Sequence, residues 1–205
     1  MYSQYSEEIH IAAATAGQPA ERRRFLDLGA WEPKTFSNSR ALYEAGWSGV
    51  VVDPSPSAIL KQVEEYGNEP QVEIVSLAVG CVPGGYGSIL PIQITEDCLS
   101  SMDTESVQKW SESGAKFVGR ILVQVVPISD ILMRFGMGFG FVNIDIEGQS
   151  VDVFRACIEA HLEPACYCVE HDGRLVELCE VATGAGYALV YSNGVNAVFG
   201  RRSCA

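Results

Sequence analysis

A chain of 205 residues, 47% hydrophobic and 20% charged, can bury the core of one α/β domain and is short for two. Its net charge of −12 gives no general attraction to a phosphate backbone, so we expect no nucleic-acid partner. Its apolar runs are too short to span a membrane, and its first ten residues lack the pattern of a secretory signal, so we expect no membrane partner. Seven cysteines without a Cys-x-x-Cys pair or a zinc-ligand spacing indicate reduced thiols and a cytoplasmic protein.

The order of the predicted elements indicates a parallel sheet. Residues 1–20 predict an N-terminal arm or a short helix, to which we assign no chemistry, and residues 21–205 predict a single domain. In that domain short apolar runs alternate with helical segments, as in βαβ units. The expected strands are 24–28, 49–53, 72–79, 140–146, 165–170, 186–191 and 195–200. The expected helices are 35–45, 56–66, 128–135, 151–161 and 174–184.

Two segments depart from this alternation. Asn193-Gly194 joins the last two strands, and Asn-Gly is a strong signal for an antiparallel hairpin. Between the third and fourth strands, residues 80–127 contain Pro83-Gly84-Gly85 and the polar run 95–106, with weak periodicity. Long insertions in compact domains are usually functional or mobile, so we interpret this one as a lid that faces the substrate.

The first two strands end in acids. Asp27 is followed by Gly29, whose lack of a side chain would let the backbone approach a ligand, and Asp53 ends the second strand. An acid about twenty residues after a glycine turn is the usual acceptor for ribose hydroxyls in nucleotide-binding α/β folds. The glycines that cradle a pyrophosphate are absent, and Glu32 would repel phosphate, so a nucleoside such as S-adenosylmethionine fits better than a dinucleotide. The structural alternatives are an Asx turn at Asp27 and a helix cap at Asp53.

The fourth strand, Phe-Val-Asn-Ile-Asp-Ile-Glu-Gly over residues 141–148, also ends in acids. Asp145 and Glu147 point from the same face of its end, where open α/β sheets bind their ligands. The structural alternative is that Glu147 and Ser150 only start the following helix.

These residues resemble the FkbM family of S-adenosylmethionine-dependent methyltransferases. Asp27-Leu-Gly29-Ala30 is similar to its Asp-x-Gly-Ala start, Asp53-Pro54-Ser55-Pro56 to its Glu-Pro-x-Pro strand end, and Asn143-Ile-Asp145-Ile-Glu147-Gly148 to its Lys-x-Asp-x-Glu-Gly core. The resemblance covers about residues 24–200. The chain departs from the family at Trp31-Glu32-Pro33, where the family has Asn-x-Gly, and at Ser150, where it has a further Glu.

The resemblance implies an α/β class I methyltransferase (Rossmann-like) fold, with a seven-stranded, mostly parallel sheet that ends in an antiparallel hairpin. It implies methyl transfer from S-adenosylmethionine, generally to a hydroxyl of a sugar or small metabolite. The residues expected to bind the cofactor are Asp27, Gly29, Ala30, Asp53, Pro54 and Ala78.

The expected catalytic base is Asp145, supported by Glu147. His171 is the alternative base, because a histidine titrates near neutrality unless its surroundings shift it. A second version of the enzyme would use Mg²⁺ held by Asp145, Glu170 and Asp172 on one sheet edge.

Two other classes stay open. A module that keeps the fold and binds a nucleoside or a partner without catalysis is the main alternative, because a fold does not fix a function. A dehydrogenase ranks third because the glycines that cradle phosphate are missing. The identity of the acceptor and the oligomeric state cannot be read from the sequence.

Overall fold

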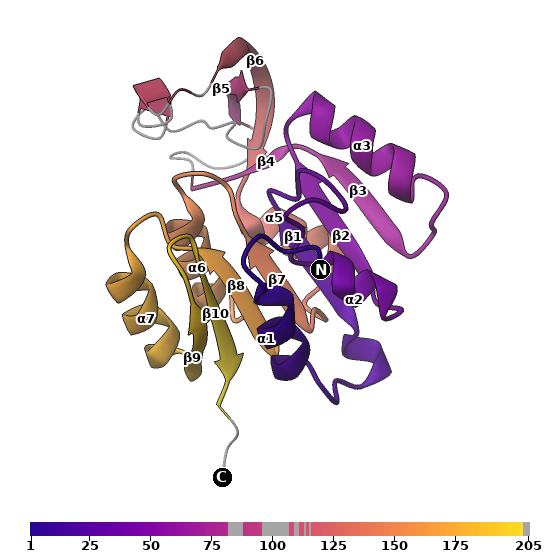
Figure 1. Cartoon of the computed structure of the whole chain (residues 1–205), viewed down its shortest axis with the longest axis vertical. Helices are drawn as coiled ribbons and strands as arrows, with labels where there is room; N and C mark the ends of the chain where they lie inside the picture. Colours follow the sequence, from indigo (N-terminus) through magenta and orange to yellow (C-terminus); the bar gives the residue numbers. More distant parts are fainter. Residues whose placement is uncertain (82–87, 96–106, 109–110, 113, 115, 203–205) are drawn as a thin grey trace.

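The computed structural model describes residues 1–81, 88–95, 107–108, 111–112, 114 and 116–202. Its centre is a seven-stranded sheet in the order β3-β2-β1-β7-β8-β10-β9 (Figure 1). The strands of this sheet are β1 (Arg24–Leu28), β2 (Ser48–Asp53), β3 (Val72–Ser76), β7 (Phe141–Ile144), β8 (Cys166–Glu170), β9 (Tyr187–Ser192) and β10 (Asn196–Arg201). The helices are α1 (Glu7–Ala14), the short 3-10 helix η1 (Ala20–Arg22), α2 (Arg40–Glu44), α3 (Pro56–Tyr66), α5 (Ile128–Phe135), α6 (Ser150–Glu159) and α7 (Leu175–Gly184).

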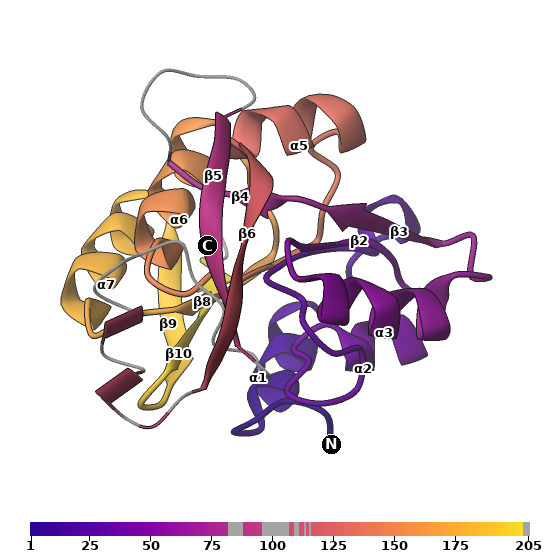
Figure 2. The same cartoon turned by 90° about the horizontal axis from the view of Figure 1, so that it is seen from above.

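The helices form a layer on each face of this sheet (Figure 2). On one face, α1, α2 and α3 contribute Ile11, Leu42 and Tyr66 to a core with Phe25 of β1. On the other face, α5, α6 and α7 pack on Leu26 and the residues beside it. Central strands buried on both faces require nearly continuous apolar residues, so the acids at their ends stand out.

The hairpin prediction is confirmed. Strand β10 pairs antiparallel with β9 on one side and with β8 on the other, so it is the reversed strand of an otherwise parallel sheet. The fold class predicted from the sequence is therefore the one observed.

The predicted strand 72–79 was wrong as a single element. Strand β3 ends at Ser76, and β4 (Ala78–Val79) pairs with Val125 and Val126 of β6 in a second sheet, ordered β4-β6-β5. The predicted helix 35–45 was too long: α2 begins only at Arg40. Its predicted first turn includes Phe36, whose positive φ of 57° is incompatible with a right-handed helix.

The insertion contains an antiparallel ribbon that the sequence analysis did not predict. Strands β5 (Ser88–Thr95) and β6 (Phe117–Val126) pair along their length and stand apart from the main sheet (Figure 1). The alternation was hard to see because the outer face is also apolar: Ile89 and Leu122 are each 67% exposed. Pro83-Gly84-Gly85 and residues 96–106 of the polar run lie outside the described residues.

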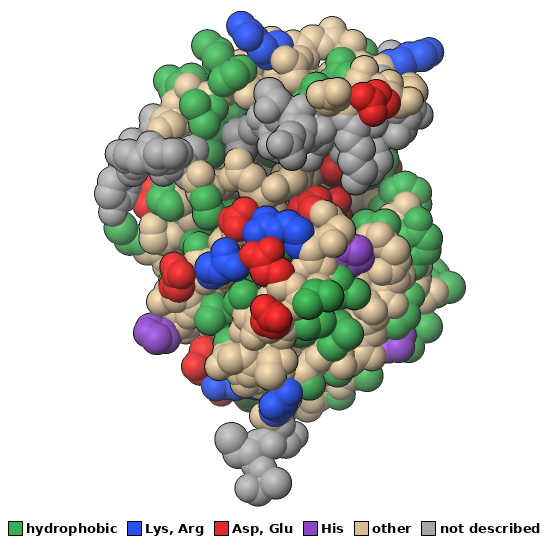
Figure 3. Space-filling model, turned by 90° about the vertical axis from the view of Figure 1, so that its left-hand side faces the viewer, with side chains coloured by type: hydrophobic (Ala, Val, Ile, Leu, Met, Phe, Trp, Pro, Cys, Tyr) green, Lys and Arg blue, Asp and Glu red, His purple; other side chains and the backbone are tan. Residues whose placement is uncertain are grey.

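Two features of the surface bear on partners. In the part of the chain that the structure describes, no helix has the length and apolarity needed to cross a membrane. Basic and acidic side chains gather together on the side of the molecule where α7 lies (Figure 3). There Arg155 and Arg174 form ion pairs with Asp152 and Glu177.

Candidate active site

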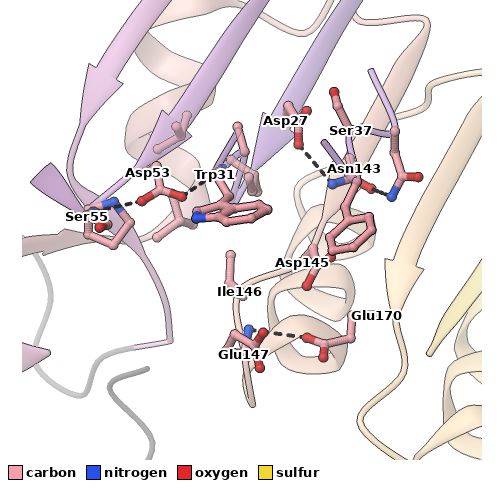
Figure 4. A pocket seen from close by; sticks show the side chains of 18 of the residues that line it. Asp27, Trp31, Ser37, Asp53, Ser55, Asn143, Asp145, Ile146, Glu147 and Glu170 are labelled. Carbon is pink, nitrogen blue, oxygen red and sulfur yellow. Dashed lines mark hydrogen bonds between the residues drawn. The ribbon is translucent and has the colours of Figure 1, made fainter. Parts of the chain in front are cut away.

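A cavity of about 370 Å³ lies at the carboxyl ends of the parallel strands, within the size range of small-molecule sites (Figure 4). Most of the residues predicted for the site line this cavity, namely Asp27, Gly29, Ala30, Asp53, Pro54, Ala78, Asp145, Glu147 and Glu170. His171 and Asp172 are not among the described lining residues. The structure therefore brings together the acids of four strand ends, as the parallel topology requires.

Asp53 is buried at the end of β2, and each of its carboxylate oxygens accepts a hydrogen bond from the backbone. The Trp31 N–H donates to its Oδ2 at 3.0 Å, and the Ser55 N–H donates to its Oδ1 at 2.7 Å. Burial raises its pKa to about 6, against the lowering effect of these two hydrogen bonds. Each carboxylate oxygen can accept a second hydrogen bond, so Asp53 fixes the loop and can still bind a ligand hydroxyl.

Asp27 begins a buried chain of polar side chains. Asn143 Nδ2 donates to Asp27 Oδ1 at 2.9 Å, and Asn38 Nδ2 donates to Asn143 Oδ1 at 3.0 Å. Ser39 Oγ donates to the other Asp27 oxygen. Burial raises the pKa of Asp27, while these donors favour its charged form. The sequence signal for Asn143 was a polar residue inside an apolar strand, which by itself predicted no role for it.

Gly29 has a structural role that the sequence did not predict. Its φ is +78°, and a Cβ atom on it would lie 1.6 Å from the carbonyl oxygen of Asp145. The Asp145 N–H donates to the Leu28 carbonyl at 2.9 Å, so the ends of β1 and β7 touch here. The glycine is thus required by the backbone that carries Asp145, although it also lines the cavity.

Asp145, Glu147 and Glu170 form the acid cluster of the site (Figure 4). One side-chain oxygen of each lies within 4.8 Å of the others. The carboxyl groups of Asp145 and Glu170 are hydrogen-bonded to each other, and burial followed by the neighbouring negative charges raises the pKa of both. A hydrogen bond between two carboxyl groups needs one proton, so this pair holds a proton that two ordinary surface acids would have lost.

Ser150 supports this cluster from the start of α6. Its Oγ donates to Glu170 Oε2 at 3.3 Å and accepts the Ile146 N–H at 3.1 Å, and the Glu147 N–H donates to the same Glu170 oxygen at 3.3 Å. The residue that replaces the further Glu of the family thus binds an acid without adding a charge. The alternative that Ser150 only starts the following helix describes part of its role, because Ser150 is the first residue of α6.

Three residues of the cavity wall other than glycine have positive φ. They are Trp31 at 34°, Phe36 at 57° and Glu147 at 52°. Such conformations are costly for residues other than glycine and tend to occur at functional sites. The rings of Trp31 and Phe36 stack with centroids 6.1 Å apart, and Glu32 between them forms an ion pair with Lys61. From the sequence, this loop was a departure from the family in which Glu32 would repel phosphate, and no role was predicted for the two aromatic rings.

His171 is held by the backbone around it and is 8% exposed. The Gly173 N–H donates to its Nδ1 at 3.1 Å, so the neutral ring carries its proton on Nε2, which donates to the Asn193 carbonyl at 3.1 Å. Both ring nitrogens have partners, and His171 is not among the described residues that line the cavity. We therefore leave His171 out of the mechanism proposed below.

The N-terminal segment, to which the sequence assigned no chemistry, forms part of the cavity wall. Gln4 and Tyr5 line the cavity. Glu7 is fully buried and accepts hydrogen bonds from Asn193 Nδ2 at 2.8 Å and Asn196 Nδ2 at 2.9 Å. The segment is thereby fixed to β10 and its turn, and no sequence motif indicated this contact.

The sheet order and the single reversed strand are those of the class I methyltransferase fold, and the cavity lies at the strand ends where such sheets bind ligands. Residues 27–181 match the methyltransferase FkbM domain. The chain belongs to this family.

Searches of solved structures give distant methyltransferases. Streptococcus pneumoniae Sp1610, provisionally described as a tRNA (m1A22) methyltransferase, is 13% identical over 98% of this chain and 73% of that chain, with a TM-score of 0.44. The METTL16 methyltransferase domain is 10% identical over 94% of this chain and 78% of that chain, with a TM-score of 0.48. The O-methyltransferase NcsB1 of neocarzinostatin biosynthesis, solved with S-adenosylmethionine and a naphthoic acid, is 15% identical over 96% of this chain and 55% of that chain, with a TM-score of 0.42. The search of curated proteins gives no match.

Proposed function

We propose that this protein transfers the methyl group of S-adenosylmethionine to a hydroxyl oxygen of a sugar or another small metabolite. The observation that carries the proposal is the Asp145–Glu170 carboxyl pair, which lines the same cavity as Asp53. A hydroxyl group is a weak nucleophile until a base takes its proton, and a carboxylate of raised pKa is suited to that step at neutral pH.

The cavity fits the cofactor in chemistry. Asp53 offers carboxylate oxygens to the ribose hydroxyls, and the side chains of Leu77 and Ala78 give an apolar wall for an adenine ring. We assign Gly29, Ala30 and Pro54 to the turns that shape this end, and Asp27, through Asn143, to the amino-acid end. When bound, the cofactor supplies an electrophilic methyl group on a positively charged sulfur, whose charge suits a cavity lined by carboxylates.

In the reaction we propose, Asp145 accepts the hydroxyl proton as the acceptor oxygen attacks the methyl carbon and the carbon–sulfur bond breaks. Glu170 positions Asp145 through their hydrogen bond, and Ser150 holds Glu170. Much of the rate would come from holding the acceptor oxygen in line with the methyl group. Glu147, whose carboxylate belongs to the same cluster, would support Asp145 through its charge.

We propose that residues 80–127 act as a lid on the acceptor side of the cavity. The support is that Ile92 of β5 lines the cavity and is 2% exposed, so the described ribbon already forms part of the wall. The acceptor we propose is a small molecule rather than nucleic acid, and the net charge of −12 supports this. We also propose that the protein works in the cytoplasm.

Mg²⁺ is a second candidate for the acid cluster. The residues that could hold it are Asp145, Glu147 and Glu170, because Asp172 is not part of the group whose oxygens converge. Such a metal would bind the deprotonated acceptor oxygen, and removing it with a chelator would abolish turnover. Turnover that is indifferent to chelator would leave Asp145 as the direct base.

The experiment that tests the proposal compares ligands on the full chain. S-adenosylmethionine, S-adenosylhomocysteine, NAD and NADP are added separately, and the melting temperature is measured, since a bound ligand raises apparent stability by mass action. We expect stabilisation by the first two and none by the dinucleotides. Stabilisation by NAD or NADP alone would support the dehydrogenase alternative. Binding of S-adenosylmethionine without methyl transfer to any of a panel of small hydroxyl compounds, sugars among them, would support the module without catalysis.

A further inference from the structure

The cavity wall contains a buried amide oxygen that has no hydrogen-bond donor. Asn196, the first residue of β10, lines the cavity and is 3% exposed. Its Oδ1 atom has no hydrogen-bond partner among the described residues. A buried acceptor without a donor is costly, so this position favours a ligand that brings an N–H or O–H group.

A buried carboxylate fixes the orientation of the Asn196 amide. Asn196 Nδ2 donates to Glu7 Oε1 at 2.9 Å, and Asn193 Nδ2 donates to the same oxygen at 2.8 Å. Burial acts to raise the pKa of Glu7, but its hydrogen bonds lower it, so Glu7 is ionised at neutral pH. A carboxylate only accepts hydrogen bonds, so the amide nitrogen of Asn196 must face Glu7 and the oxygen must point elsewhere. The charge behind the amide polarises it and makes its oxygen a better acceptor.

The order of the strands places Asn196 away from the cofactor and beside the proposed base. Asn196 is the direct antiparallel partner of Glu170 in the β10–β8 ladder, and Glu170 is hydrogen-bonded to Asp145. Asp53 ends β2, and β1, β7 and β8 lie between β2 and β10 (Figure 4 shows Asp53 across the cavity from Asp145). Neighbouring strands are about 4.8 Å apart, so β10 is roughly 19 Å from β2, too far for one ribose to contact both. Asn196 is therefore left to the acceptor.

A second open amide oxygen lies on the cofactor side of the cavity. Asn38 lines the wall, is 4% exposed, and its Oδ1 also has no partner among the described residues. Its Nδ2 donates to Asn143, which donates to Asp27, so this amide belongs to the ends of β1 and β7. The amino-acid part of the cofactor, which we assign to that end, carries an ammonium group with the N–H donors that this oxygen needs. The cofactor therefore does not require Asn196.

We infer that Asn196 determines acceptor specificity by accepting a hydrogen bond from a second hydroxyl or N–H group of the acceptor, next to the hydroxyl that is methylated. This inference rests on the proposed function and specifies its acceptor. The reacting hydroxyl gives its proton to Asp145, and its oxygen takes the methyl group as the carbon–sulfur bond breaks. The second group keeps its proton and holds the acceptor in line with the methyl group. A site with such an unpaired acceptor discriminates against an analogue that lacks the matching donor.

The test uses three probes that share one ring and differ in one hydroxyl group: cyclohexanol, cis-cyclohexane-1,2-diol and trans-cyclohexane-1,2-diol. Binding of S-adenosylhomocysteine to the full chain is first measured by calorimetry. Methyl transfer from labelled S-adenosylmethionine to each probe is then measured as kcat/KM per hydroxyl group. We expect the better diol to exceed cyclohexanol by at least about tenfold. Equal values, a preference for cyclohexanol, or no transfer to both diols would overturn the inference.

Two variants assign the preference to Asn196. Asn196→Ala should lower kcat/KM for the better diol to the level of cyclohexanol and leave cyclohexanol and the affinity for S-adenosylhomocysteine within about twofold. Asn196→Asp keeps an oxygen at the same place and should keep part of the preference. Asn68→Ala, which removes an exposed amide, is the control and should change none of these values. If Asn196→Ala does not fold, the comparison of the three probes on the wild-type chain still decides.

The outcomes separate this inference from the proposed function. A preference for the diol that survives in folded Asn196→Ala, or a tenfold loss of affinity for S-adenosylhomocysteine in that variant, would overturn the role of Asn196. Equal transfer to cyclohexanol and the diols would remove only this inference. Failure of S-adenosylhomocysteine to bind the wild-type chain would remove the proposed function as well.

Discussion

Asp53 and Asp145 end two strands of the same sheet edge, and both have a raised pKa, but their surroundings differ. Asp53 receives backbone N–H groups on both oxygens, and burial alone accounts for most of its shift. Asp145 faces Glu170 and Glu147, and their negative charges add to the effect of burial. One end of the cavity thus holds acids with fixed donors, which suits binding. The other holds acids that share a proton, which suits proton transfer.

The largest effect should come from Asp145→Asn. The amide keeps the size of the carboxylate but cannot act as a base, so turnover should fall by about 10²–10⁴ while affinity for S-adenosylhomocysteine stays within a few-fold. A methyl-transfer assay and calorimetry on the same preparation measure the two. Normal turnover in this variant would leave the acids at the end of β7 as structural residues only.

Gly29→Ala should destabilise the fold, because the new side chain would collide with the Asp145 carbonyl where the ends of β1 and β7 touch. Gly136 is a matched control, because it has the same φ of +78° but a Cβ there would meet nothing within 4 Å. We expect a loss of about 1 kcal/mol in the free energy of unfolding for Gly136→Ala and roughly 2–4 kcal/mol for Gly29→Ala. If denaturant unfolding gave equal losses of free energy for the two variants, the Asp145 carbonyl would be shown to move aside easily.

Asp53→Ala should weaken ligand binding at the cofactor end of the cavity only. Removing the acceptor leaves ligand hydroxyls unpaired, at a cost of roughly 1–3 kcal/mol in the binding of S-adenosylhomocysteine. Asp130→Ala, a partly exposed acid on α5, is the control and should bind normally. Calorimetry that finds the same affinity in both variants would remove Asp53 from the cofactor site.

The smallest effect concerns stability and pH. The folded-state pKa values of Asp53, Asp145 and Glu170 are raised, so the folded protein binds protons more tightly than the unfolded chain. The free energy of unfolding of the ligand-free protein should therefore fall by about 1–2 kcal/mol as the pH rises through about 6, which is the pKa of Asp53. It should fall further at higher pH, as the Asp145–Glu170 pair ionises. Glu7 has a lowered pKa, so its protonation changes the stability only in more acid solution. Denaturant unfolding at several pH values measures this slope, which Asp145→Asn should flatten. A slope of the opposite sign would contradict the raised pKa values.

The sequence predicted the main sheet and most of the acids that line the cavity because both depend on local patterns. Apolar runs that end in Asp27, Asp53 and Asp145 identify parallel strands and, with them, the edge where ligands bind. The Asn193-Gly194 turn identified the reversed strand in the same way. The acids converge because parallel strands share one carboxyl edge, which is a property of topology rather than of spacing.

What the sequence did not show depends on contacts between distant segments. Tyr5 reaches the cavity because Glu7 is buried against Asn196, a contact across 189 residues. The role of Gly29 could not be seen without knowing that Asp145 lies beside it. The β5–β6 ribbon was hidden because both of its faces carry apolar residues, so the period of two that marks a half-buried strand was lost.

The most direct test of the whole account is a crystal structure of the protein with S-adenosylhomocysteine. We predict that the ribose hydroxyls donate hydrogen bonds to the Asp53 carboxylate and that the sulfur faces Asp145 and Glu170. Such a complex would place the missing methyl group next to the carboxyl pair. A ligand bound away from Asp53, or with its sulfur turned from the acid cluster, would contradict the division of the cavity into a binding end and a reacting end.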